Sequence, residues 1–366
     1  LGHSDFFTGA FPAEIGNAYA GVFDLKLRKG NKEKRSYTLQ VGTLGLAASA
    51  EGYFKKGGSS SYLLNYRYST IDIIDRFLPA ITEDVFPFQD FSMKINLHTE
   101  KAGTFSFFGL SGSTSTFDPM NRDTSDYDFI WDLDEANTSQ KLNAWGLSHQ
   151  ILLSNSSYIR TSLGHTDWRY SDETRRLNPQ NNFVPVIIDK TDFAEQQWTL
   201  TSKYHRKINA SSSLRAGFTF RKQIYFYDFK GIGTDGQFLS FLENKGKTYL
   251  MDGFGQFKKN LSDFWILNAG INISHFTLNG ATGIDPRIGI IYRLNENKRI
   301  GLSTGLYTKP DHLSTYFIER RNLNGDISTP NIDLPMIKSI HLVGSYDQTL
   351  ENNLRLKIEG YYQHLY

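Results

Sequence analysis

The sequence predicts an all-β chain that folds as an antiparallel transmembrane β-barrel. Apolar and polar residues alternate along segments of about ten residues, as in strands with one face on lipid and one on a polar lumen. The connections between these segments are short and long in turn, and Tyr, Phe and Trp gather at the segment ends. Mean hydropathy is −0.42, and no apolar run approaches the roughly 18 residues that a membrane-spanning helix needs.

Composition narrows the possible functions. The chain has 366 residues, of which 39% are hydrophobic and 21% charged, with a formal net charge of +2. Nucleic-acid-binding proteins usually carry many more basic residues, so we expect no nucleic-acid partner. The chain has no cysteine, which excludes disulfide bonds and thiol catalysis.

Alternation is clear in residues 91–98, 214–221, 265–274 and 354–363. In residues 265–274 we expect one face on lipid and the other on the lumen, because successive strand side chains point to opposite faces. The expected lipid-facing residues are Trp265, Leu267, Ile271 and Ile273, and the expected lumen-facing residues are Asn268, Asn272 and Ser274. A soluble β-sandwich would show the same alternation with its apolar face turned inward.

The lengths of the connections favour the barrel. Short ones are expected at residues 55–59, 100–103, 154–156, 208–210, 260–262, 295–297 and 348–352, and long polar ones at residues 71–87, 115–138, 171–189, 228–245 and 310–333. Outer-membrane barrels have tight turns at one rim and long loops at the other. A sandwich gives no reason for this pattern.

Residues 34–54 are too long for one membrane span, and Gly42, Thr43 and Gly45 lie where a tight hairpin could turn. Two strands here bring the total to about fifteen. An odd number needs further strands to close, because bacterial barrels are even-numbered. One bent strand would instead give about fourteen and a complete barrel.

Aromatic residues near the segment ends are expected at the membrane–water boundary, where both the ring and its polar edge are satisfied. They include Trp168, Tyr170, Tyr225, Phe226, Tyr227, Tyr361 and Tyr362.

Residues 1–30 do not read as a membrane strand. Residues 12–17 (Pro-Ala-Glu-Ile-Gly-Asn) and 20–28 (Ala-Gly-Val-Phe-Asp-Leu-Lys-Leu-Arg) resemble the last turn and strand of the plug domain of TonB-dependent outer-membrane receptors. In that family a plug fills a barrel of about 22 strands and leads directly into the first barrel strand. The resemblance implies that residues 1–33 are the C-terminal end of a plug and residues 34–366 a barrel, incomplete at its C-terminus. The alternative for residues 1–30 is a loop and edge strand of an ordinary domain.

Residue 1 is Leu and no signal peptide is present, so we expect further sequence upstream, including most of the plug and the TonB box. The resemblance implies a receptor in the outer membrane of a Gram-negative bacterium that binds a scarce nutrient, such as a siderophore, cobalamin, a saccharide or a peptide, and imports it into the periplasm. Its implied partners are TonB with the inner-membrane motor proteins, the extracellular nutrient ligand, membrane lipid and lipopolysaccharide, and a surface lipoprotein.

Other functional classes are less well supported. Residues 301–305 match the Gly-x-Ser-x-Gly pattern of hydrolases, but that pattern needs a sharp strand-to-helix turn, and here we expect an ordinary strand. The nine histidines are scattered, without the spacing of a zinc site. We therefore expect no enzyme and no catalytic residue. A passive or substrate-specific channel, a barrel-embedded hydrolase and a soluble carbohydrate-binding β-protein are the alternatives.

The loop at residues 117–137 is the main candidate for ligand binding. Its candidate ligand-binding residues are Asp126, Tyr127, Asp128, Trp131, Asp132 and Asp134. Carboxylates at this density could hold Ca²⁺ through Asp126, Asp128, Asp132 and Asp134. The alternative is a solvated loop that repels lipopolysaccharide or is bridged to it by divalent ions. Arg320 and Arg321 could meet an anionic ligand or simply be solvated.

Glu14 and Asn17 are the candidate plug–barrel contacts. Glu14 could pair with an inward-facing cation of the barrel wall and hold the plug in place. The candidate cations are Arg215, Arg221, Arg355 and Lys357. The alternative is that such charges are hydrated in the lumen, and exposed pairs contribute little.

Overall fold

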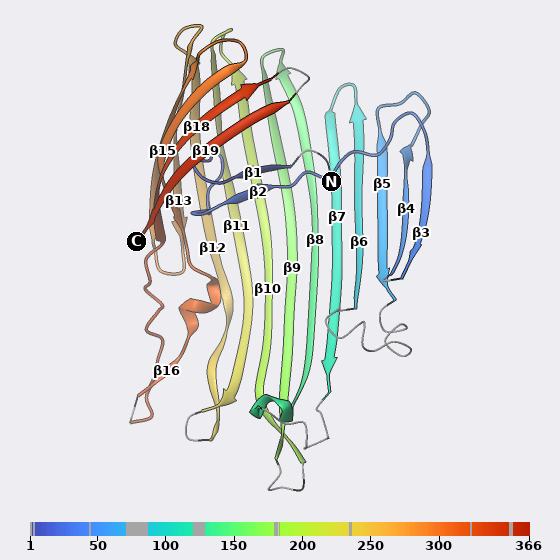
Figure 1. Ribbon diagram of the computed structural model, residues 1–366, viewed down its shortest axis with the longest axis vertical. Coiled ribbons are helices and arrows are strands. Elements are labelled where there is room, and N and C mark those ends of the chain that lie inside the picture. Colours follow the sequence, from blue (N-terminus) through green and yellow to red (C-terminus); the bar gives the residue numbers. More distant parts are fainter. Residues whose placement is uncertain are drawn as a thin grey trace.

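A computed structural model of the chain describes residues 2, 4–43, 45–70, 87–119, 129–178, 182, 184–233, 236–322, 324–350 and 354–366 (Figure 1). Fifteen strands form one antiparallel sheet in which each strand pairs with its neighbours along the chain. The order is β3 to β15, then β18 and β19, because β16 (Arg320–Arg321) and β17 (Ile327–Ser328) form a separate small hairpin. The outermost strands, β3 and β19, are not paired with each other in the described part of the chain.

The strands of the first half are β3 (Ser36–Gly42), β4 (Gly45–Tyr53), β5 (Ser61–Ser69), β6 (Phe88–Thr99), β7 (Gly103–Asp118), β8 (Asp134–Ser154), β9 (Ser157–Asn178) and β10 (Val184–Lys207). Those of the second half are β11 (Ser212–Ile232), β12 (Phe238–Asn260), β13 (Trp265–Phe276), β14 (Thr282–Arg293), β15 (Lys298–Lys309), β18 (Ile337–Thr349) and β19 (Arg355–Leu365). Gly42 pairs with Gly45 across the first turn, which confirms that residues 34–54 form two strands.

The two faces of the sheet are those that alternation predicts. On β13, Ile273 is 46% exposed on the outer face, whereas its neighbour Asn272 is 1% exposed on the inner face. Trp265 and Ile271 are also exposed, and Ser274 is buried. Because the large apolar side chains point away from a single sheet, the described residues do not form a two-sheet sandwich.

Several strands are much longer than expected. Strands β8 to β12 contain 21–24 residues each, whereas about ten suffice to cross a membrane. Residues 171–189, expected as a loop, lie mostly in β9 and β10, and residues 117–118 and 134–137 are strand as well. The expectation of a loop was wrong because the outward positions of these strand segments do not carry the apolar residues by which strands were recognised. The outward face carries ion pairs instead, with Glu173 bound to Arg175 at 2.5 Å and to Lys190 at 3.6 Å, and such charges avoid lipid.

These long strands extend toward the end of the sheet that carries the long connections, whereas the turns after β4, β6, β8, β10, β12, β14 and β18 lie at the other end (Figure 1). Among the described residues the helical elements are short 3₁₀ turns such as η2 (Ile130–Leu133) and η4 (Leu313–Phe317). None of the helices described has the length and apolar character to cross a bilayer.

The segment that contains η4 folds back against the inner face of the long strands. Tyr316 and Phe317 of η4 are buried with Tyr225 and Tyr227 of β11 and with Phe276 of β13 in one hydrophobic cluster. The expected boundary position of Tyr225 and Tyr227 was therefore wrong. Both rings lie inside, because the segment after β15 covers them.

The N-terminal residues cross the inner face of the sheet at mid-height (Figure 1). Their strands β1 (Asp5–Phe7) and β2 (Val22–Asp24) pair with each other and not with the barrel sheet. At its far end the segment reaches β4 and β5, where Arg28 pairs with Glu51 at 2.5 Å and Gly30 lies against the backbone of Tyr62. The division between the two domains at residues 33 and 34 stays a prediction.

Candidate functional site

Arg287 is the most highly connected residue between the N-terminal segment and the sheet. It points inward because Asp285 and Arg287 alternate on β14 with the exposed Ile284 and Ile288. Its Nη1 donates to the carbonyl oxygens of Pro12 and Ile15, both at 2.7 Å, and to that of Phe11 at 3.4 Å. Its Nη2 bonds Asp285 Oδ2 at 3.3 Å. With only 7% of Arg287 exposed, these bonds are made away from bulk water, where an unpaired charge would be costly.

The Phe11 ring lies between wall side chains. Its centroid is 4.3 Å from that of Tyr307 on β15 and 5.7 Å from that of His341 on β18. The Arg287 guanidinium is 5.3 Å from the same ring, within the range of a cation–π contact. Phe11 is therefore an apolar anchor beside the Arg287 hydrogen bonds.

Further wall side chains bind the backbone on either side. Ala10 N donates to His341 Nδ1 at 3.3 Å, so the opposite nitrogen, Nε2, carries the proton that is donated to Tyr19 O at 2.9 Å. Ala13 is held twice: its N donates to Gln256 Oε1 at 3.1 Å and its O accepts from Asn272 Nδ2 at 3.0 Å. Residues 10–19 are thus held through their main chain.

Within residues 10–19, Glu14 forms ion pairs with the wall. Its carboxylate is 2.9 Å from Arg215 Nη1 and 3.3 Å from Lys203 Nζ. Both cations are well exposed, so each pair stabilises the contact only weakly. Asn17 adopts a left-handed φ of 55° in the same stretch. The other candidate wall cations pair within the wall: Arg221 with Asp252, Arg355 with Asp347 and Lys357 with Glu359.

The acidic candidates at the long-loop end are only partly described. Asp126, Tyr127 and Asp128 lie outside the described residues, and Trp131 is placed only by its backbone in η2. Asp132 Oδ2 accepts from Phe129 N at 2.8 Å, and Asp134 is 2.6 Å from Arg176. In the described ranges no three acidic or histidine side chains are placed to hold a metal ion, and the Ca²⁺ site stays a prediction.

Arg320 and Arg321 form β16 and are exposed. Arg320 pairs with Ser328 and Arg321 with Ile327 in the short hairpin with β17. The structure therefore places them on a surface hairpin, apart from the acidic residues of η2.

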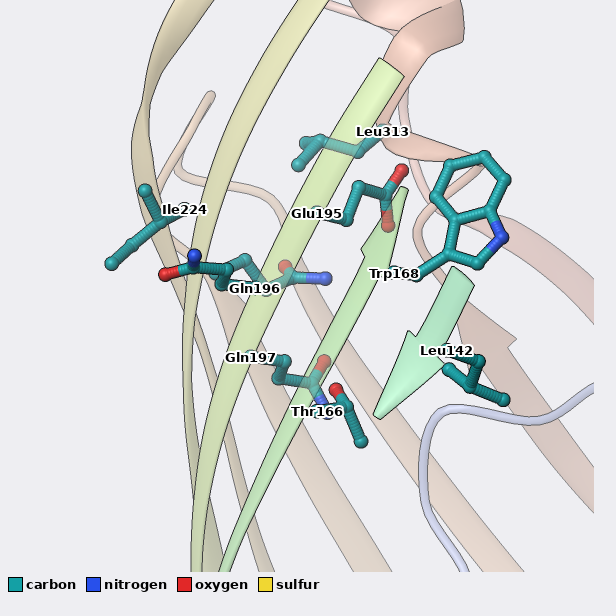
Figure 2. A pocket seen from close by; sticks show the side chains of 9 residues that line it. Leu142, Thr166, Trp168, Glu195, Gln196, Gln197, Ile224 and Leu313 are labelled. Carbon is teal, nitrogen blue, oxygen red and sulfur yellow. The ribbon is translucent and has the colours of Figure 1, made fainter. Parts of the chain in front are cut away.

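A cavity of about 200 Å³ opens on the inner face of the long strands. Figure 2 shows Glu195 between Leu313 and Trp168, with Thr166 and Gln197 below them. Trp168 was expected at the membrane boundary but lines this cavity, because register places it opposite the inward Glu195. Tyr227 OH donates to Glu195 Oε1 at 2.6 Å.

Comparison with known proteins gives matches among solved structures. The ferric enterobactin receptor PfeA of Pseudomonas aeruginosa matches with a TM-score of 0.66 and 11% identity, over 99% of this chain and 57% of that one. The siderophore receptor PirA of Acinetobacter baumannii matches with a TM-score of 0.68 and 12% identity, over 99% and 57%. This chain has the fold of a TonB-dependent receptor barrel.

The outer-membrane ferripyoverdine receptor of Pseudomonas aeruginosa also matches, with a TM-score of 0.67 and 12% identity, over 99% of this chain and 52% of that one. The chain thus spans just over half the length of these receptors. No protein-family model and no curated protein sequence matches it. The predicted fold and the resemblance in fold are confirmed, and the receptors that match are not enzymes.

Sequence reasoning missed Arg287, His341, Asn272 and Gln256 as contacts of the N-terminal segment. Each occupies an inward position of its strand, so alternation alone could have placed it on the lumen face. Which inward residues meet the N-terminal segment depends on where that segment crosses the sheet, and no local pattern encodes this.

Proposed function

We propose that the complete protein is a TonB-dependent receptor of a Gram-negative outer membrane, which binds a scarce nutrient outside and imports it into the periplasm. The fold is that of receptors for ferric enterobactin and ferripyoverdine, so siderophores are one candidate class of cargo. Cobalamin, saccharides and peptides are the other candidate classes. The long-loop end would face outward and the short turns the periplasm.

The observation that carries this proposal is the segment held across the lumen face. Residues 8–19 bind four strands through Gln256, Asn272, Arg287 and His341, and Thr8 O also accepts from Gln363 at 2.9 Å. A lumen crossed by ordered chain is not an open diffusion pore. Movement of this segment needs work, and the outer membrane has no ATP, so the work would come from TonB and its motor.

A hydrolase has less support. Residues 301–305 lie inside β15, which pairs with β14 and β18 on its two sides. The nucleophile turn that the Gly-x-Ser-x-Gly pattern requires is therefore not present at this position.

The test is uptake by cells that express the complete protein, with and without a functional TonB motor. Labelled ferric siderophores, cobalamin and oligosaccharides are supplied in turn. We expect accumulation of one class only in motor-competent cells. Equal accumulation without the motor would contradict the receptor and favour a passive or substrate-specific channel.

A matched pair of variants links the test to the structure. Arg287→Met weakens the hold on residues 11–15 and should change motor-dependent uptake. Lys357→Met, which disrupts a pair within β19, should leave uptake near that of the unmodified receptor.

A further inference from the structure

The cavity at Trp168 is separate from the contacts that hold the N-terminal segment. Its inward floor comes from four neighbouring strands at one level, β8 to β11. Trp168 lies opposite both Leu142 and Glu195, and Gln197 lies opposite both Thr166 and Gln223. Because a residue pair in register shares a face of the sheet, these side chains form one inner surface. Leu313 of η4 closes one side of it.

Some polar atoms in this cavity are held by hydrogen bonds within the protein, and others make none. Tyr227 OH fixes Glu195 through Oε1, and Gln197 Nε2 donates to Thr199 Oγ1 at 3.0 Å. Among the described residues, Glu195 Oε2, Gln197 Oε1 and the Gln223 amide make no hydrogen bond to another side chain or backbone group. They offer acceptors on three groups and a donor on the Gln223 amide.

The charge of the cavity selects against anions. Its lining contains the Glu195 carboxylate and no Lys or Arg. Among the described residues, the basic side chain within 4 Å of Glu195 is His312, whose Nε2 is 3.9 Å from Oε1 and whose side chain is well exposed. An anionic ferric chelate would lose hydration here and gain no positive partner.

We propose that this cavity is a binding subsite for one ring of a neutral saccharide. This inference rests on the proposed function and names a cargo class for it. The indole of Trp168 offers an apolar face for the C–H face of a sugar ring. Glu195, Gln197 and Gln223 surround it with groups that accept from and donate to hydroxyls. A volume of about 200 Å³ suits one ring of a longer chain, since it is below the several hundred Å³ of sites that enclose a whole drug-sized ligand.

The experiment is calorimetric titration of the complete receptor in detergent with a panel of neutral oligosaccharides, namely malto-, cello-, xylo- and manno-oligosaccharides. Ferric enterobactin serves as the anionic comparison. We expect at least one neutral oligosaccharide to bind. Any binding of the anionic chelate should be the same with and without the Trp168 side chain. Loss of stacking in Trp168→Ala should weaken the affinity for the oligosaccharide roughly tenfold. The double change Gln197→Leu and Gln223→Leu should weaken this affinity at least as much.

Trp198→Ala is the matched control. Trp198 lies on the opposite face of β10, exposed and packed edge-on against Trp145 at a centroid distance of 5.4 Å. Its loss should leave sugar affinity unchanged. Circular dichroism and the heat-modifiable gel mobility of each variant identify any that fails to fold, and Trp168→Leu, which is apolar but has no aromatic face, then replaces Trp168→Ala.

The proposal is overturned if no neutral oligosaccharide binds, or if Trp168→Ala and Trp198→Ala weaken binding equally. Binding of a basic peptide that is lost in Glu195→Gln would assign the cavity to a cationic ligand and also overturn it. These outcomes differ from failure of the receptor itself. Motor-dependent uptake of a ferric siderophore by a receptor that binds no neutral oligosaccharide would refute the saccharide subsite and leave the proposed function standing.

Discussion

Replacing Arg287 by Met should free the N-terminal segment from the wall more than any change at Glu14. Arg287 is 7% exposed and makes two hydrogen bonds of 2.7 Å to main-chain carbonyls in addition to its bond to Asp285. Met fills similar volume but leaves the buried Asp285 carboxylate without its cation. Removing one partner of a buried pair costs about 3–5 kcal/mol, which raises the equilibrium constant for local opening of the segment by roughly a hundredfold or more.

Hydrogen exchange measured by mass spectrometry on the complete receptor in detergent would detect this. Peptides that cover residues 8–19 should exchange faster in Arg287→Met by the same factor, while peptides from β9 should not change. Arg215→Met is the control. Arg215 is well exposed and Glu14 keeps Lys203, so the cost should be about 0.2–1 kcal/mol.

A second change sharpens the reasoning. Adding Asp285→Asn to Arg287→Met removes the uncompensated charge and should recover part of the protection. Asp285 Oδ2 also accepts from Thr308 N at 3.0 Å, a bond that an Asn side-chain oxygen can keep. Equal exchange in Arg287→Met and Arg215→Met would refute the view that burial makes Arg287 the principal anchor.

Three further predictions concern stability. Ala269→Arg places a charge on the lipid face of β13 and should lower the free energy of unfolding by about 2–4 kcal/mol in a folding titration. Asn268→Arg, one residue away on the lumen face, should cost less. Equal costs would contradict the assignment of these two residues to opposite faces. A Cβ on Gly30 would lie 1.9 Å from Tyr62 O, so Gly30→Ala should destabilise the receptor by about 1–3 kcal/mol, while Gly253→Ala, with nothing within 4 Å, should be nearly neutral in the same titration. His341→Leu leaves the part-buried Ala10 N–H and Tyr19 C=O without their partner and should cost about 0.5–1.5 kcal/mol for each hydrogen bond. Unchanged hydrogen exchange at residue 10 would argue against the bond from Ala10 N to His341.

The sequence alone determined the outer and inner faces of the clearly alternating strands, such as β13. Alternation has a period of two whatever the rest of the fold does, so Ile273 and Asn272 could be assigned to opposite faces from their order in the chain. The Gly42 and Gly45 hairpin and the short turns at one rim also followed from local chemistry, because turn residues act over a few positions. Resemblance of residues 12–28 to a plug tail located the segment that crosses the lumen.

Other features depended on tertiary structure. A run of charged residues such as Glu173 and Arg175 is typical of a loop when only the sequence is considered. In the structure these residues form ion pairs with neighbouring strands, Glu173 with Lys190 and Arg175 with Glu135, and the strand continues through them. Tyr227 is aromatic at a strand end whether it faces lipid or lumen, and the fold-back of η4 decided that it is buried. Glu14 meets Arg215 across 201 positions of sequence, a separation over which no local pattern acts. Register and the path of the N-terminal segment decide such contacts, because they bring together residues whose spacing along the chain carries no signal.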